Sequence, residues 1–128
     1  MTSKIKFEIE FSIHASTSLL YQYISTASGL AEWFADNVNS RGEIFTFIWD
    51  DNEEKAKLLS KKTGERVKFR WLADENTSFF FEMKIVEDEI TKDVSIVVTD
   101  FAEEDEVEEN KMLWENMIQE LKHLIGAT

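Results

Sequence analysis

The chain has 128 residues and a formal net charge of −12, with 26 acidic and 14 basic side chains. The sequence contains no cysteine, which excludes disulfides, thiolate metal sites and cysteine nucleophiles. The acidic balance argues against nucleic acids and anionic membrane surfaces as partners. Apolar residues make up 43% of the chain, and no apolar run reaches the length of a membrane span. The first residues lead into an alternating pattern, so we do not expect a signal peptide there. We therefore expect one cytoplasmic domain over residues 1–128, with no stable membrane association.

The N-terminal part predicts a strand followed by two short helices. Residues 4–13 alternate apolar and polar side chains, as a half-buried strand does. Its apolar face would hold Ile5, Phe7, Ile9, Phe11 and Ile13. Ser16 can cap a helix over residues 17–26, and Ser28 can cap a second short helix. Gly29 and the polar residues before it favour a break between the two helices.

The middle of the chain returns to a period of two from about residue 38. The predicted strands cover residues 43–50, 54–62, 66–72, 77–86 and 94–99, with turn residues between them. Short turns join antiparallel neighbours, so we expect five or six antiparallel strands in this part of the chain. On the polar face, Glu82 and Lys84 are expected to pair across strands with Lys68 and Arg70.

Basic residues gather in this region despite the acidic composition. They are Lys55, Lys57, Lys61, Lys62, Arg66, Lys68 and Arg70. Two interpretations remain open: the solvent face of two neighbouring strands, or a docking patch for an acidic partner.

The C-terminal part predicts one long amphipathic helix over about residues 106–125. Its apolar stripe consists of Trp114, Met117, Ile118, Leu121, Leu124 and Ile125. The acidic run 103–109 lies at the start of this helix, where carboxylates complement the helix dipole, and Gly126 is a suitable terminator. The run lacks the alternating ligands and the glycine of a calcium-binding loop, so we interpret it as a solvated helix start.

These elements predict an α+β fold of the order β-α-α-β(5–6)-α. Strands that are apolar on one face need a cover for that face. The C-terminal helix is the only predicted element large enough to provide it. We therefore expect a curved antiparallel sheet wrapped around that helix.

The element order and two short motifs resemble the START-like (SRPBCC) helix-grip superfamily. The motifs are Ser28-Gly-Leu-Ala-Glu-Trp-Phe-Ala35 and the strand Gly42-Glu-Ile-Phe-Thr-Phe-Ile-Trp49, and Trp114 in the last helix also fits. Within the superfamily the chain is most similar to the homologues of the heat-shock chaperone ATPase activator and to small uncharacterised START-like proteins. The absence of proline departs from the usual pattern around the first helices.

The resemblance implies an apolar cavity between the sheet and the last helix that binds lipid-like or polyketide-like ligands. The candidate ligand-binding residues are Trp33, Phe34, Phe47, Trp49, Phe69, Trp71, Phe81, Met83, Trp114 and Met117. Large aromatic side chains and methionine suit an adaptable apolar pocket. The same side chains would also serve to fill a core, and the sequence leaves both alternatives open.

No residue pattern predicts a catalytic or metal site. His14 ends the first predicted strand and His123 lies near the end of the last predicted helix, so we do not expect them to form a working pair. Without cysteine the only other metal ligands are carboxylates. Asp100 continues the inward face of the last predicted strand and is expected near the cavity mouth or in the following loop. We therefore expect no catalytic residues, no metal and no cofactor, and a non-enzymatic binding function.

An interaction module is the alternative function. The outer face of the sheet would present Ile44, Ile48, Phe80 and Val97. An exposed apolar patch there would suit a homodimer, whereas long side chains such as Lys68 and Arg70 would cover it. The family resemblance also implies a chaperone as partner.

Overall fold

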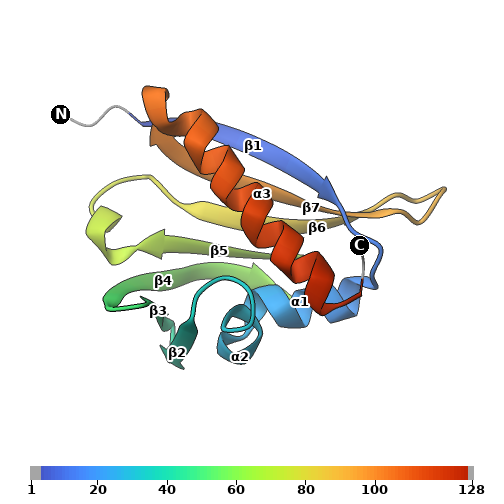
Figure 1. Cartoon of the computed structure of the whole chain (residues 1–128), viewed down its shortest axis with the longest axis horizontal. Coiled ribbons are helices and arrows are strands. Elements are labelled where there is room, and N and C mark those ends of the chain that lie inside the picture. Colours follow the sequence, from blue (N-terminus) through green and yellow to red (C-terminus); the bar gives the residue numbers. More distant parts are fainter. Residues whose placement is uncertain (1–3, 127–128) are drawn as a thin grey trace.

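The computed structural model describes residues 4–126, which form one seven-stranded antiparallel sheet and three helices (Figure 1). The strands are β1 (Lys4–Ser12), β2 (Asn37–Arg41), β3 (Ile44–Trp49), β4 (Asn52–Lys62), β5 (Arg66–Trp71), β6 (Phe81–Glu87) and β7 (Val94–Glu103). The helices are α1 (Thr17–Ser25), α2 (Ala27–Leu30) and α3 (Val107–Leu124), with 3₁₀ turns η1 (Leu72–Asp74) and η2 (Glu104–Glu106). This order confirms the predicted α+β helix-grip architecture.

The sheet has the order β1-β7-β6-β5-β4-β3-β2, so the first and last strands of the sequence are neighbours. β1 pairs with β7 along its whole length, from Lys4 opposite Glu103 to Ser12 opposite Ser95. Every other pairing joins strands that are consecutive in the sequence. The single non-local pairing brings the start of the chain next to the strand that leads into α3.

Helix α3 crosses one face of the sheet diagonally, with its C-terminal end near α1 (Figure 1). Trp114, Ile118 and Leu121 are buried on its sheet side, as the apolar stripe predicts. The helix ends where predicted: Gly126 has a φ of 71°, and its N–H donates to the carbonyl oxygen of His123 at 3.2 Å. The long helix thus covers the apolar face of the sheet.

The two short helices are separated by a single extended residue. Ser16 caps α1 as predicted, because its Oγ accepts a backbone N–H of the first turn. The predicted cap at Ser28 is wrong. Thr26, which has the extended backbone of a capping residue, caps α2 by accepting the N–H of Gly29 at 2.9 Å. A Cβ at Gly29 would collide with the carbonyl oxygen of Gln22, so glycine lets α2 lie directly against α1.

Two strand boundaries differ by four residues from the predicted ones, and one further strand is present. The strand predicted over residues 77–86 begins only at Phe81, because residues 77–80 form a turn closed by side-chain hydrogen bonds. The strand predicted over 94–99 continues to Glu103, because β1 pairs with it there. An additional short strand, β2, pairs with β3 at the edge of the sheet.

The structure also differs from the prediction in the exposure of one residue of β1 and in one cross-strand pair between β5 and β6. Ile5 is 45% exposed although it belongs to the apolar series of β1, because it lies near the end of an edge strand. In the register of β5 and β6, Lys68 lies opposite Glu82 as predicted. Lys84 lies opposite Arg66 instead of Arg70, because in an antiparallel pair two residues forward from Glu82 on β6 face two residues back from Lys68 on β5.

Candidate functional site

A pocket of about 690 Å³ lies between the sheet and α3 and opens to solvent. Its lining comes from the α2–β2 connection, four strands and one side of α3. The residues are Phe34, Trp49, Asn52, Glu53, Glu54, Trp71, Asp100, Asn110, Leu113, Trp114 and Met117. The volume falls within the range of about 300–1,000 Å³ that is typical of small-molecule sites.

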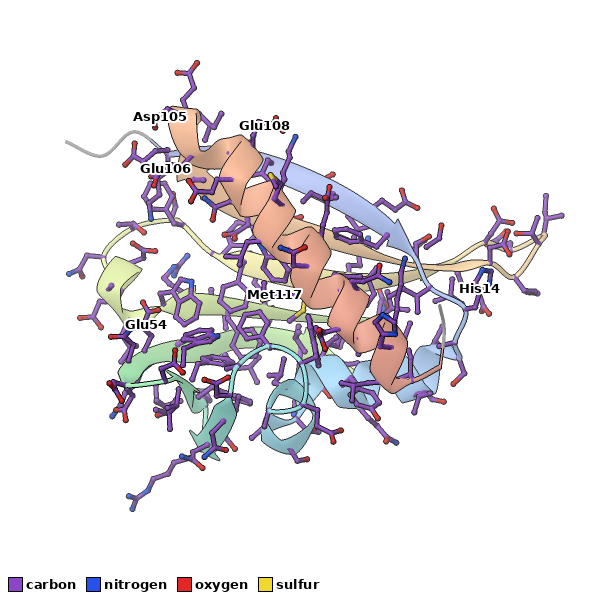
Figure 2. All side chains as sticks on the ribbon, viewed as in Figure 1. His14, Glu54, Asp105, Glu106, Glu108 and Met117 are labelled. Atoms are coloured by element: carbon purple, nitrogen blue, oxygen red, sulfur yellow. The ribbon has the colours of Figure 1, made fainter. Side chains whose placement is uncertain are left out.

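The two sides of the pocket are a sheet wall and a helix wall. Glu54 projects from the start of β4, and Met117 lies under the middle of α3, on the side that faces the sheet (Figure 2). On α3 the lining residues Asn110, Leu113, Trp114 and Met117 follow the spacing of one helix face. A ligand in the pocket would therefore touch strand and helix residues at once.

Aromatic rings form the inner surface of the pocket. The ring of Phe34 lies between the two walls, with its centroid 6.1 Å from that of Trp49 and 5.7 Å from that of Trp114. Trp49 and Trp71 are neighbours on the sheet wall, with centroids 6.2 Å apart. Beneath them Phe81 stacks on Phe34 at 5.8 Å and is itself buried. The aromatic network holds Phe34 in place as the floor of the pocket.

Asp100 is the most constrained polar group of the lining. Its Oδ2 accepts the indole N–H of Trp114 at 2.9 Å, and its Oδ1 accepts the backbone N–H of Phe101 at 2.7 Å. Burial raises the pKa of this carboxyl above its ordinary value, an effect that these two hydrogen bonds and the charge of Lys4 oppose; the charge of Asp74 raises the pKa further. The bond to Asp100 fixes the orientation of Trp114 in the helix wall.

The other indole N–H groups differ in their partners. Trp33 donates to the carbonyl oxygen of Tyr23 at 2.9 Å, and Trp49 donates to that of Phe34 at 3.1 Å. The indole of Trp71 makes no hydrogen bond with residues 4–126. Trp71 therefore carries an indole N–H for which none of the described residues is the acceptor.

The ten predicted ligand-binding residues divide into two groups. Phe34, Trp49, Trp71, Trp114 and Met117 line the pocket. The other five, Trp33, Phe47, Phe69, Phe81 and Met83, are buried in the core behind it. The sequence left two alternatives open for these residues, a lined cavity and a filled core. Each alternative describes one of the two groups.

The polar part of the lining was not predicted, apart from the position of Asp100. Asn52 lies opposite Trp49 and Glu54 lies opposite Phe47 in the β3–β4 register, so both share the face of those aromatic residues. Glu53 also borders the pocket, although the alternation turns its side chain toward the other face. The β3–β4 register could have been predicted from the turn at residues 50–52 in the sequence. The position of α3 over the sheet, which completes the lining, could not have been predicted in this way.

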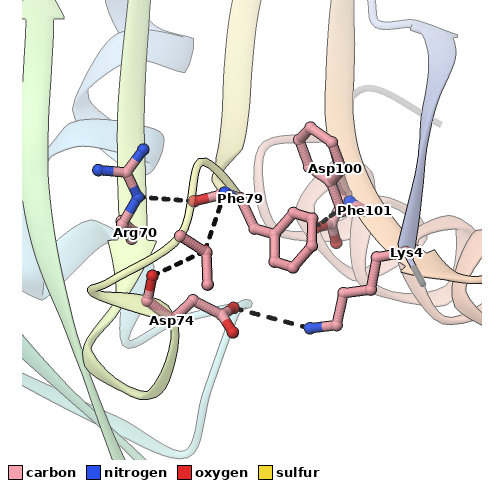
Figure 3. A network of polar contacts seen from close by, with 7 residues as sticks. Lys4, Arg70, Asp74, Phe79, Asp100 and Phe101 are labelled. Atoms are coloured by element: carbon pink, nitrogen blue, oxygen red, sulfur yellow. Dashed lines mark hydrogen bonds and ion pairs between the residues drawn. The ribbon is translucent and has the colours of Figure 1, made fainter. Parts of the chain in front are cut away.

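Next to the pocket, a network of polar contacts joins β1, β5 and the connection between β5 and β6 (Figure 3). Lys4 of β1 pairs with Asp74 of η1 at 3.7 Å, and its ammonium lies 5.2 Å from the ring centroid of Phe79. The Nε of Arg70 donates to the carbonyl oxygen of Phe79 at 2.8 Å. The β5–β6 loop is thereby fixed to both β5 and β1. A smaller hollow of about 180 Å³, lined partly by Lys4 and Asp100, adjoins the main pocket here.

The described residues hold no group of three or more histidine, aspartate or glutamate side chains placed to bind a metal ion. His14 and His123 are both exposed and lie outside the pocket lining. Within residues 4–126, no helix combines the length and the apolar character needed to cross a bilayer.

The expected apolar patch on the outer face of the sheet is partly covered. Ile44, Ile48, Phe80 and Val97 are all half-buried. The ammonium of Lys68 lies 4.1 Å from the ring centroid of Phe80, so this lysine covers the ring as one alternative predicted.

Comparison with known proteins identifies the fold. A family model for START-like superfamily domains matches residues 1–127. A solution structure of a Bacteroides fragilis protein is 33% identical, with 98% of this chain and 93% of that chain covered and a TM-score of 0.69. The comparison with curated proteins gives no match.

Two further solved structures share the fold at low sequence identity. The Aha1 dimer from Colwellia psychrerythraea is 16% identical, with a TM-score of 0.77 and coverage of 92% of this chain and 93% of that one. DynU16, described as a putative protein in the dynemicin biosynthetic locus, is 14% identical with a TM-score of 0.76. Here 94% of this chain aligns to 47% of that one.

Proposed function

The chain belongs to the START-like superfamily, and from that premise we propose that it binds a small hydrophobic ligand, without catalysis, in the pocket between the sheet and α3. The observation that carries the proposal is the pocket itself. It measures about 690 Å³ and combines aromatic walls with a few polar groups. This combination is typical of sites that bury an apolar ligand and orient it through a few hydrogen bonds.

The residues proposed to contact the ligand are the five predicted ones that line the pocket. Trp49 and Trp71 supply the sheet wall, Trp114 and Met117 the helix wall, and Phe34 the floor. Trp33, Phe47, Phe69, Phe81 and Met83 support this lining from the core, and we propose an indirect role for them.

The first experiment is native mass spectrometry of the purified protein, followed by the denatured spectrum. A mass excess that disappears on denaturation would identify a co-purified ligand. In parallel, N-phenyl-1-naphthylamine, a neutral apolar probe, should bind saturably and increase its emission. The absence of both a mass excess and saturable probe binding would contradict the proposal.

Two neighbouring residues of α3 provide a matched pair of variants. Leu113 lines the pocket and is 55% exposed, whereas Met112 is 63% exposed and lies outside the pocket lining. Leu113→Trp should obstruct the pocket and weaken probe binding by about tenfold or more, equivalent to about 1.4 kcal/mol. Met112→Trp should leave the affinity unchanged. Equal effects of the two variants would place the probe elsewhere.

A second candidate function is a homodimeric or chaperone-associated interaction module without a bound ligand. The fold similarity to a protein whose structure is an Aha1 dimer favours this candidate. The native spectrum used above also reports the monomer or dimer mass. A monomer at high concentration, confirmed by light scattering, would remove the homodimer, and lack of stimulation of a purified chaperone ATPase would remove the chaperone role.

A further inference from the structure

Aromatic side chains form much of the pocket lining, and two of them, Trp49 and Trp71, belong to the sheet wall. Trp49 and Trp71 are half-buried, so each leaves part of its indole accessible. Their centroids are 6.2 Å apart and their planes are inclined by 53°, which gives the sheet wall two faces of different direction. The face of an indole carries negative electrostatic potential and attracts cations within about 6 Å of its centroid.

The charged groups of the pocket are all of one sign. Glu54 shares the face of the aromatic residues on β4, and Asp100 lies on β7 beside Trp114. Glu53 adds a third carboxyl at the border, and the lining contains no lysine, arginine or histidine. The carboxylates of this lining therefore favour a positive charge in the pocket over a negative one.

The nearby cations lie outside the pocket lining. Lys4 is held by the carboxylate of Asp74 at 3.7 Å and by the ring of Phe79. Lys55 and Lys57 follow Glu54 in β4, but the alternation of the strand places them on the opposite face. No basic side chain thus neutralises the pocket from within its lining.

We infer that this pocket selects apolar ligands that carry a positive charge, amines or quaternary ammonium compounds, over neutral and anionic ligands of the same size. The inference rests on the proposed function and names its ligand class. An apolar body would lie between Met117 and the rings, and the cationic group would lie against Trp49 or Trp71, near Glu54. An anionic head group would be repelled, because no donor cation lines the pocket.

The test compares three ligands with the same eight-carbon chain: octylammonium, 1-octanol and octanoate. Tryptophan fluorescence titrations at neutral pH and about 0.15 M salt would give the affinities. We expect octylammonium to bind about tenfold more tightly than octanol, from cation–π attraction and the screened charge of Glu54. Octanoate should bind more weakly than octanol.

Two variants locate the origin of the preference. Glu54→Gln should reduce the ratio of octylammonium to octanol affinity about three- to fivefold, because the lost charge weakens octylammonium binding more than octanol binding. Glu10→Gln makes the same charge change on β1, where Glu10 is exposed outside the pocket, and should leave the ratio unchanged. Trp71→Leu should weaken octylammonium binding more than octanol binding and so lower the ratio, because it removes a ring but keeps the site apolar.

The outcomes separate the two proposals. Octanol binding without a preference for octylammonium, or tightest binding of octanoate, would overturn the inference and leave the proposed function intact. An equal loss of preference in Glu10→Gln would assign it to the net charge of the molecule and would also overturn the inference. If none of the three ligands binds, the proposed function fails, and the inference fails with it.

Discussion

Asp100 shows how one residue connects the sheet, the helix and the pocket. It belongs to the inward series of β7, accepts the indole N–H of Trp114 and borders the pocket. The hydrogen bonds from Trp114 and Phe101 stabilise the ionised carboxyl, but burial opposes them and is the larger effect on its pKa. Asp100 is therefore a structural group whose charge lowers the free energy of unfolding.

This arrangement predicts a pH dependence that can be isolated with Asp100→Asn. The folded state holds the Asp100 proton more tightly than the unfolded state does, because the folded pKa is raised above its ordinary value of 3.8. The contribution to stability is therefore complete below the unfolded pKa and is lost as the pH rises through the folded pKa. The free energy of unfolding of the native protein minus that of the variant should fall over this interval.

Urea unfolding at several pH values between about 3.5 and 7.5 would measure this difference. The other carboxyl groups titrate in both proteins and cancel in the subtraction. Asp105→Asn, at an exposed residue of η2, is the control and should give a difference that does not vary with pH. A difference for Asp100→Asn that is constant or rises with pH would show that burial does not dominate.

At the scale of elements, α3 has two functions: it covers the sheet and forms one wall of the pocket. Trp114, Ile118 and Leu121 are buried against the sheet, whereas Met112 and Leu113 are exposed. The stripe of the helix was predicted from its period, because burial of one face is a local property of spacing. Which residues beside the stripe would border the pocket depends on the crossing of α3 over the sheet.

We predict a large contrast between two alanine variants of α3. Leu121 is fully buried, so Leu121→Ala should lower the free energy of unfolding by about 2–5 kcal/mol through lost burial and a cavity. Met112 is 63% exposed, and Met112→Ala should change it by less than about 0.5 kcal/mol. Urea unfolding of both variants is the measurement. Similar losses of unfolding free energy in the two variants would mean that α3 is rotated differently about its axis.

At the scale of the whole molecule, the charges are unevenly distributed. The chain carries a net charge of −12, yet basic side chains oppose one another across β4, β5 and β6. Lys57 lies opposite Arg70, and Arg66 lies opposite both Lys62 and Lys84. The described residues form four ion pairs, two of which involve Glu65. Repulsion between like charges is therefore only partly offset.

Screening of this repulsion should make the protein more stable in salt. Between about 20 and 300 mM NaCl the Debye length falls from roughly 20 to 6 Å. We expect Tm to rise by several degrees, which corresponds to about 1 kcal/mol for a chain of this size. KCl at equal ionic strength should give the same rise in thermal unfolding. A fall in Tm would show that attractive ion pairs outweigh the repulsion.

The sequence by itself determined the element types, their order and most of the buried faces. These follow from periods of two and 3.6, turn residues and caps, all of which are local. Even the failures were local: Thr26 replaced Ser28 as a cap, and the turn at residues 77–80 was predicted as strand. The aromatic residues were correctly expected on the inward face, because alternation reports sidedness.

Only the tertiary structure decided which of those aromatic residues line a pocket and which fill the core. Phe47 and Phe69 alternate on the same inward face as Trp49 and Trp71, but the former are fully buried and the latter are half-exposed. The difference arises from the curvature of the sheet and the crossing of α3, which set the space above each strand position. Residue spacing along one strand contains no information about how far α3 lies from each strand position. The pocket and its acidic lining therefore form only when the strands and the helix are assembled.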